Sequence, residues 1–230
     1  HLERVWLDER GPWRDLVGVF THTPLATPEG DAEPSPRAAP KSLQTESLHP
    51  PGSPAEERVS GTVSYLDVLS QIHETLRPAR YLEIGVRHGR SLALAQGQAL
   101  GVDPAPDIQV ALGADAEVLA MSSDAFFDDE AATRLAQAPD LVFIDGMHLF
   151  EFALRDFMSV ERYSAPLTLV LIDDILPNHP QQAQRARETR VWTGDVWKLL
   201  LCLRQARPDL LLLPLDTNPP GTLLGLRVDA

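Results

Sequence analysis

The sequence contains little of several residue types, and each shortage excludes a class of protein. A single cysteine, Cys202, excludes an internal disulfide and a cysteine-rich zinc site. The 20 lysines and arginines are outnumbered by 33 aspartates and glutamates, and a net charge of -13 argues against nonspecific binding to nucleic acid or to an anionic membrane. No apolar run approaches the roughly 18 residues of a membrane span, and the start does not resemble a signal peptide. We therefore expect a soluble, cytoplasmic protein that acts on small molecules.

Composition divides the 230 residues into three stretches. Residues 1–21 are apolar, and residues 22–60 are rich in proline, which interrupts helices and sheet ladders, so we expect a linker or surface arm there. Residues 61–230 are expected to form the folded domain. The chain begins at His1 rather than methionine, which is consistent with excision from a longer protein, and the N-terminal arm is a candidate contact for homo-oligomer formation.

From Ser64 onward the apolar pattern predicts helices and strands in alternation. Ser64 is the expected N-cap of a helix that Pro78 ends. Further helices are expected at 91–98, 129–137, 150–163 and 181–205, the last with a break at Thr193-Gly194. Strands are expected at 81–84, 99–102, 117–121, 141–144 and 167–172, with a closing hairpin at 210–215 and 222–228. This order predicts a Rossmann-like, doubly wound α/β sheet that is mainly parallel, with an antiparallel C-terminal hairpin strand.

Two of the expected strands end directly in acidic residues. Asp145 follows the run at 141–144, and Asp173-Asp174 follows the run at 167–172. The carboxyl ends of neighbouring parallel strands open onto one edge of a sheet, where α/β proteins bind ligands, so the three acids should converge.

Converging carboxylates favour a bound cation. Two carboxylates about 4 Å apart repel by roughly 4 kcal/mol at an effective dielectric near 20, and a divalent ion removes that cost. Oxygen ligands favour magnesium, manganese or calcium over zinc. The alternative is that Asp173-Asp174 only caps the loop before Pro177, and that Asp145-Gly146 is an ordinary turn after a strand.

The first expected strand of the sheet ends in a glycine-containing loop. Gly85 and Gly89 let the backbone turn sharply and approach a ligand, and Asp103 at the end of the next strand is placed to accept hydrogen bonds from ribose hydroxyls. The glycine spacing departs from the G-x-G-x-x-G of dinucleotide sites, which weakens an NAD interpretation. A glycine turn without any ligand remains the alternative.

The segment from Leu82 to Ser91 resembles the first motif of class I S-adenosylmethionine-dependent methyltransferases. The resemblance spans about residues 64 to 230 and implies the seven-stranded sheet of that family. It also implies S-adenosyl-L-methionine as cofactor. The residues implied to bind it are Glu83, Gly85, Gly89, Ser91 and Asp103, with Ser123 and Asp124 bordering the adenine and Asp145 beside them.

The acids resemble those of divalent-cation-dependent O-methyltransferases of the catechol type and of related antibiotic-sugar enzymes. In those families the metal carboxylates follow the fourth and fifth strands, which here implies Asp145, Asp173 and Asp174 as ligands of Mg²⁺, or of Mn²⁺ or Ca²⁺. The lysine base of the catechol enzymes is replaced by His148. His148 is the first candidate base beside Asp145, His179 is the second, and a surface pairing of His148 with Glu151 or Asp156 is the alternative.

These features predict an S-adenosylmethionine-dependent O-methyltransferase, assisted by a divalent metal, that acts on a hydroxyl of a small molecule or sugar. Two rivals remain: an NAD-type oxidoreductase, and a non-catalytic ligand-binding module of the same fold. The stretch Arg190–Trp197, in which Gly194 stands between two tryptophans, either lines the acceptor pocket or packs in the core.

Overall fold

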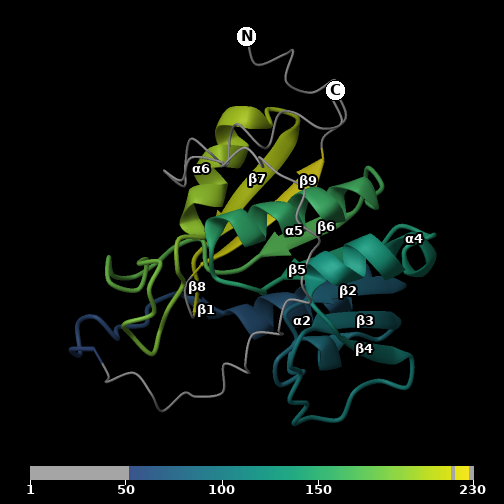
Figure 1. Cartoon of the computed structure of the whole chain (residues 1–230), viewed down its shortest axis with the longest axis horizontal. Helices are drawn as coiled ribbons and strands as arrows, with labels where there is room; N and C mark the ends of the chain where they lie inside the picture. The colour runs from purple at the N-terminus through teal and green to yellow at the C-terminus, as the bar shows by residue number, and fades with distance from the viewer. Residues whose placement is uncertain (1–51, 219–220, 228–230) are drawn as a thin grey trace, which may run out of the picture. The chain divides into compact units, whose positions relative to one another are not determined.

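A computed structural model describes residues 52–218 and 221–227 (Figure 1). The predicted apolar segment 1–21, most of the predicted arm 22–60 and the oligomer contact assigned to that arm lie outside the described residues and stay predictions. Within the described part of the chain, no helix is long and apolar enough to cross a membrane.

The main sheet confirms the predicted α/β architecture. Its order in the described residues is β4-β3-β2-β5-β6-β9-β7, which makes seven strands. β4, β3, β2, β5 and β6 run parallel to one another, and β9 is antiparallel to both β6 and β7. The strands are β2 (Arg80–Ile84), β3 (Gln98–Asp103), β4 (Ala116–Ala120), β5 (Leu141–Ile144), β6 (Leu169–Ile172), β7 (Leu210–Leu215) and β9 (Thr222–Arg227). A two-stranded sheet pairs β1 (Val63–Ser64) with β8 (Thr217–Asn218).

The register of the central strands brings their carboxyl ends to one level. Ile84 of β2 pairs with Ile144 of β5, which pairs with Ile172 of β6. The residues that follow these three strands therefore stand side by side at one edge of the sheet, as the sequence predicted for the acids.

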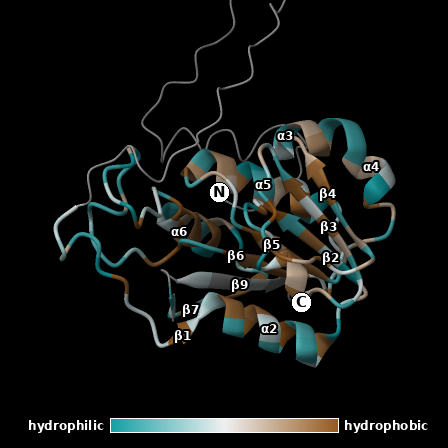
Figure 2. Ribbon diagram, turned by 90° about the horizontal axis from the view of Figure 1, so that it is seen from below, coloured by the Kyte–Doolittle hydropathy of each residue, from teal (hydrophilic) through white to brown (hydrophobic). Residues whose placement is uncertain are grey.

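Helices cover both faces of the sheet. They are α2 (Tyr65–Leu76), α3 (Ser123–Ala125), α4 (Ala131–Arg134), α5 (Phe150–Arg162) and α6 (Trp197–Ala206). Figure 2 shows α2 on one face and α5 and α6 on the other. Leu69 of α2 packs in one core cluster with Tyr81, Phe143 and Leu171 from three strands, so the central strands are covered by apolar side chains. Ser64 caps α2, as predicted, by accepting a hydrogen bond from the Leu66 N–H.

Three predicted helices are wrong over part of their length. The segment 91–98 forms only a short 3-10 turn at Leu92–Leu94, because Gly97 lies against the Ala79 carbonyl and β3 already begins at Gln98. The segment 129–137 is a π turn at Phe126–Glu130 followed by α4.

The predicted helix 181–205 forms only from Trp197 onward, as α6. In the preceding loop the side chains of Gln182, Thr189 and Thr193 hydrogen-bond to backbone groups, which competes with helix formation. Gly194 there has a positive φ of 55°.

Candidate active site

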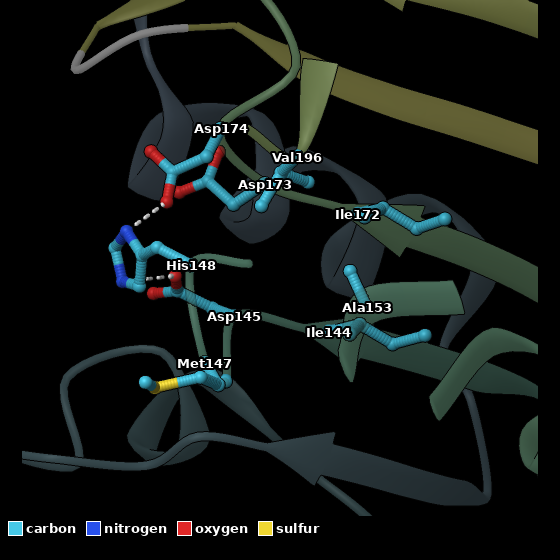
Figure 3. A pocket seen from close by; sticks show the side chains of 10 residues that line it. Ile144, Asp145, Met147, His148, Ala153, Ile172, Asp173, Asp174 and Val196 are labelled. Atoms are coloured by element: carbon cyan, nitrogen blue, oxygen red, sulfur yellow. Dashed lines mark ion pairs between the residues drawn. The ribbon is translucent and has the colours of Figure 1, made fainter. Parts of the chain in front are cut away.

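The loops after β5 and β6 form a small pocket at the edge of the sheet (Figure 3). Asp145, His148 and Asp174 face one another there, and one ligand atom from each lies within 4.8 Å of the other two. The His148 Nδ1 lies 2.6 Å from an Asp174 carboxylate oxygen, and its Nε2 lies 3.9 Å from Asp145. The predicted convergence of Asp145 and Asp174 is therefore present, with His148 between the two carboxylates.

The His148 ring is held in one orientation. Its Nδ1 also lies 2.9 Å from the Trp192 carbonyl oxygen, and the two rings stack at 5.3 Å with an interplanar angle of 8°. Both polar partners of Nδ1 are acceptors, so Nδ1 carries the proton and Nε2 is the nitrogen turned toward Asp145. Although burial disfavours the charged imidazolium, Asp174 and then Asp145 raise the pKa of His148 to about 9.

The carboxylates of the pocket are destabilised in their charged forms. Burial and the nearby Asp174 raise the pKa of Asp145 to about 7. Asp174 adopts a positive φ of 67°, a conformation that costs a non-glycine residue energy and turns the chain directly after Asp173. Carboxylates packed this closely are stabilised by a positive charge, which His148 supplies in this arrangement.

Asp173 lies beside Asp174 in the pocket and has a hydrogen-bond partner of its own. Its carboxylate accepts a hydrogen bond of 2.9 Å from the Thr222 hydroxyl, which lies 2.9 Å from the Thr217 hydroxyl. Burial and repulsion from Asp145 and Asp174 raise its pKa well above the usual range. Asp173 lines the pocket, but the group of potential metal ligands in the described residues comprises Asp145, His148 and Asp174.

The glycine loop after β2 contacts the loop that follows β5 and begins with Asp145, which we call the acidic loop. A Cβ on Gly85, which has a φ of +87°, would lie 2.0 Å from the Asp145 carbonyl oxygen, so only glycine allows this contact. Glu83 is fully buried and accepts hydrogen bonds from the Ser91 hydroxyl at 2.6 Å and the Tyr81 hydroxyl at 2.7 Å. Burial raises the pKa of Glu83 to about 8. The hydrogen bond between Glu83 and Ser91 therefore joins the strand before the glycine loop to the residue that follows it and stabilises the loop.

Asp103 also supports the glycine loop. One carboxylate oxygen accepts hydrogen bonds from the Val86 and Arg87 N–H groups at 2.9 and 2.8 Å, and the other accepts one from Ala105. Gly89, at the far end of the loop, has a φ of +78°. The predicted ribose acceptor is therefore placed beside the loop.

Ser123 and Asp124, the predicted adenine neighbours, lie in the turn of α3 and contact the adjacent helix α5. Ser123 hydrogen-bonds to Asp156, whose pKa is raised to about 6 by burial. Asp124 forms a 2.8 Å ion pair with Arg155.

His179 is not among the described residues that line the pocket. Its Nδ1 accepts a hydrogen bond from the Gln181 N–H at 3.1 Å. The structure thus brings His148 to the acids and leaves His179 in a neighbouring turn.

The sequence matches a known family in the region that builds this edge. Residues 82–175 match a family model described as a methyltransferase domain. Three solved structures share the fold. Cofactor-bound Rv0187 from MTB has 18% identity and a TM-score of 0.54 over 74% of this chain and 83% of that one. SAH-bound methyltransferase PaMTH1 from Podospora anserina has 15% identity and a TM-score of 0.54 over 71% and 78%. An O-methyltransferase from Bacillus cereus in complex with SAH has 14% identity and a TM-score of 0.50 over 73% and 83%.

The fold is that of the class I methyltransferases. The predicted resemblance to S-adenosylmethionine-dependent O-methyltransferases of this class is confirmed. No curated protein sequence matches the chain.

Three further residues of this methyltransferase fold contribute to the site. Trp192 belongs to the stretch Arg190–Trp197, for which lining the pocket was one of the two predicted roles, whereas Thr222 and Tyr65 were not predicted. Trp192 holds His148, Thr222 holds Asp173, and Tyr65 at the start of α2 lies near Asp145 and Asp173 while its ring stacks on Phe143 at 6.0 Å. Burial and then the two carboxylates raise the pKa of Tyr65. The glycine that interrupts the predicted helix after Trp192 indicated a special role for that tryptophan. In the sequence, Thr222 and Tyr65 are not distinguishable from ordinary strand and helix residues.

Proposed function

We propose that this protein is an S-adenosylmethionine-dependent O-methyltransferase, assisted by a divalent metal, that methylates a hydroxyl of a small molecule or sugar. The observation that carries the proposal is the contact between the glycine loop and the acidic loop. Gly85 lies against the Asp145 carbonyl, so a cofactor on the first loop would stand next to a cation or hydroxyl on the second.

The proposed cofactor site uses the loop after β2 and the residues around it. Gly85 and Gly89 leave room for the cofactor to approach the backbone, while Glu83 and Ser91 brace the loop. Asp103 would accept hydrogen bonds from the ribose hydroxyls in place of one of its present backbone donors. Ser123 and Asp124 are proposed to border the adenine. The role of these residues is the positioning of the methyl donor.

The proposed metal ligands are Asp145, Asp173 and Asp174. The donor set fits a hard divalent cation, because carboxylates dominate it and repel one another without a positive charge. Asp145 and Asp174 already face a common point, and Asp173 lies beside them, tied to Thr222. When bound, such an ion would lower the pKa of a substrate hydroxyl.

His148 is the proposed base, acting through Nε2. Nδ1 is committed to Asp174 and the Trp192 carbonyl, so Nε2 is the atom left to accept a proton from the substrate hydroxyl. A cation on the same carboxylates would repel the imidazolium and favour the neutral form of the ring. S-adenosylmethionine, if bound at the glycine loop, would supply the methyl group: an O–CH3 bond would form as the S–CH3 bond breaks and S-adenosylhomocysteine leaves. The contribution of this chain's residues would be mainly positioning.

Calorimetry with two ligands tests the cofactor assignment. We expect S-adenosylhomocysteine to bind the full chain and NAD⁺ not to bind. Binding of NAD⁺ alone would favour the rival oxidoreductase, and binding of neither would refute the proposal. Transfer of a labelled methyl group to a vicinal diol such as 3,4-dihydroxybenzoate would then separate an enzyme from a non-catalytic module.

A further inference from the structure

Gln182 is a fully buried polar residue that the proposed chemistry does not use. Its side-chain amide nitrogen donates hydrogen bonds of 2.8 Å to the carbonyl oxygens of Glu56 and Arg58, and its side-chain oxygen accepts one from the Asn178 N–H. Its main-chain carbonyl accepts bonds from the N–H groups of Thr193 and Gly194 at 3.0 and 3.1 Å. Gln182 thus joins two segments more than 120 positions apart.

We call residues 52–60 the strap and residues 178–194 the site loop. A second set of contacts joins them. The Glu57 carboxylate accepts hydrogen bonds from the N–H groups of Arg190 and Val191 at 2.9 and 3.0 Å, and Asn178 accepts one from the Ser60 N–H at 2.8 Å. Both ends of the site loop are therefore fixed to the strap by hydrogen bonds to backbone groups.

Trp192 lies between the two fixed points. Glu57 holds Val191 on one side of it, and Gln182 holds Thr193 on the other. The Trp192 indole N–H donates to the Gln184 carbonyl at 2.6 Å, and the indole ring stacks on His148. The site loop also contacts the His148 backbone at Gly194. A Cβ at this position would lie 1.6 Å from the His148 carbonyl oxygen.

We propose that Gln182 is a positioning residue: by tying the strap to the site loop, it holds Trp192 on His148 and so fixes the direction of the His148 Nε2. The proposal rests on the proposed function only in treating His148 as the group that meets the acceptor. The sequence assigned the strap to a linker. The hydrogen bonds of Gln182 connect it to the loop that carries Trp192.

The test is the isosteric change Gln182→Glu, with Gln184→Glu as the matched control. The first replaces a donor that faces two carbonyl oxygens by an anionic oxygen; the second makes the same change on an exposed side chain of the same loop that donates to one carbonyl. The readout is the His148 ring-proton resonance in the full chain, identified by its absence in His148→Asn. The parallel Trp192 ring should shift it upfield, and Trp192→Leu should abolish that shift.

We expect Gln182→Glu to remove most of this upfield shift and to speed hydrogen exchange of the Thr193 and Gly194 amides by about tenfold or more. Gln184→Glu should change neither, and S-adenosylhomocysteine affinity should stay within about threefold of wild type in both variants. An unshifted His148 resonance in the wild type, or a Gln182→Glu spectrum like that of wild type, overturns the proposal.

A second variant covers the case in which Gln182→Glu does not fold. Glu57→Ala removes the acceptor of Arg190 and Val191 from the strap side, and we expect the same loss of the His148 shift. Retention of the shift in folded Glu57→Ala protein would refute the role of the strap. Failure of wild-type protein to bind S-adenosylhomocysteine would instead refute the proposed function and leave the resonance test unaffected.

Discussion

At the scale of single residues, the two candidate bases differ in what surrounds them. His148 stands between Asp145 and Asp174 with Nε2 turned into the pocket, whereas His179 accepts a backbone hydrogen bond in a neighbouring turn. The sequence placed both close to the acids along the chain. Only the fold separates them, because the side chain that orients His148 belongs to Trp192, 44 positions away.

This difference predicts unequal effects on catalysis. We expect His148→Asn to lower kcat for methylation of 3,4-dihydroxybenzoate by about 10²-fold or more, the usual contribution of a general base, and His179→Asn to leave kcat within about threefold. S-adenosylhomocysteine affinity should be retained in both. A larger loss in His179→Asn would show that the base has been assigned to the wrong histidine.

His73 in α2 is a second informative residue because its buried imidazole lacks a hydrogen-bond partner in the part of the chain that the structure describes. It is 1% exposed, neither ring nitrogen has a hydrogen-bond partner among the described residues, and it packs edge-on against Tyr81 at 4.7 Å. Burial lowers its pKa. The unfolded chain therefore takes up a proton at this position at a higher pH than the folded protein does, and the folded state is penalised as the pH falls below about 6.5.

We expect His73→Leu to raise the free energy of unfolding by about 1–3 kcal/mol, because an unsatisfied polar group leaves the core. The variant should also lose part of the decline in stability below about pH 6.5. Denaturant unfolding from pH 5 to 8 measures both effects. His88→Asn, in the glycine loop, is the control; if it removes the pH dependence as His73→Leu does, the assignment to His73 fails.

At the scale of elements, strands were predicted more accurately than helices. The strand 141–144 agrees at both ends with β5, because a continuous apolar run stops at Asp145. The predicted helix 91–98 and the 181–196 part of the predicted helix 181–205 failed for reasons outside their own sequence. Gly97 packs on the Ala79 carbonyl, and Gln182 bonds to the strap, so long-range contacts outweighed a local apolar pattern.

Alanine substitutions at the two glycines of the glycine loop test whether glycine is required at each position. Gly85 and Gly89 both have positive φ, so alanine at either position should cost about 1–2 kcal/mol of stability. At Gly85 the new Cβ would also overlap the Asp145 carbonyl at 2.0 Å, while at Gly89 it would meet only side chains at 3.2 Å and beyond. We expect Gly85→Ala to be the more destabilising in thermal unfolding and to weaken S-adenosylhomocysteine binding more. Equal effects would contradict the close contact between the two loops.

At the scale of the whole molecule, the parallel register makes a single site out of distant segments. The ends of β2, β5 and β6 lie level, so the glycine loop, Asp145 and Asp174 meet although they span some 90 positions. That convergence was predictable from strand order and the direction of parallel strands. The different hydrogen-bond partners of Asp173 and Asp174 were not predictable, because Asp173 is bound by Thr222 from the antiparallel strand β9.

The central claim is a cation held at this edge by Asp145 and Asp174, and it is tested most directly by calorimetric titration of Mn²⁺ into the full chain saturated with S-adenosylhomocysteine. We expect wild type to bind one equivalent, Asp174→Asn to bind at least about tenfold more weakly because a charged ligand is lost, and Asp128→Asn, which changes an exposed acid, to bind like wild type. Absence of Mn²⁺ binding in wild type, or unchanged binding in Asp174→Asn, would contradict the claim.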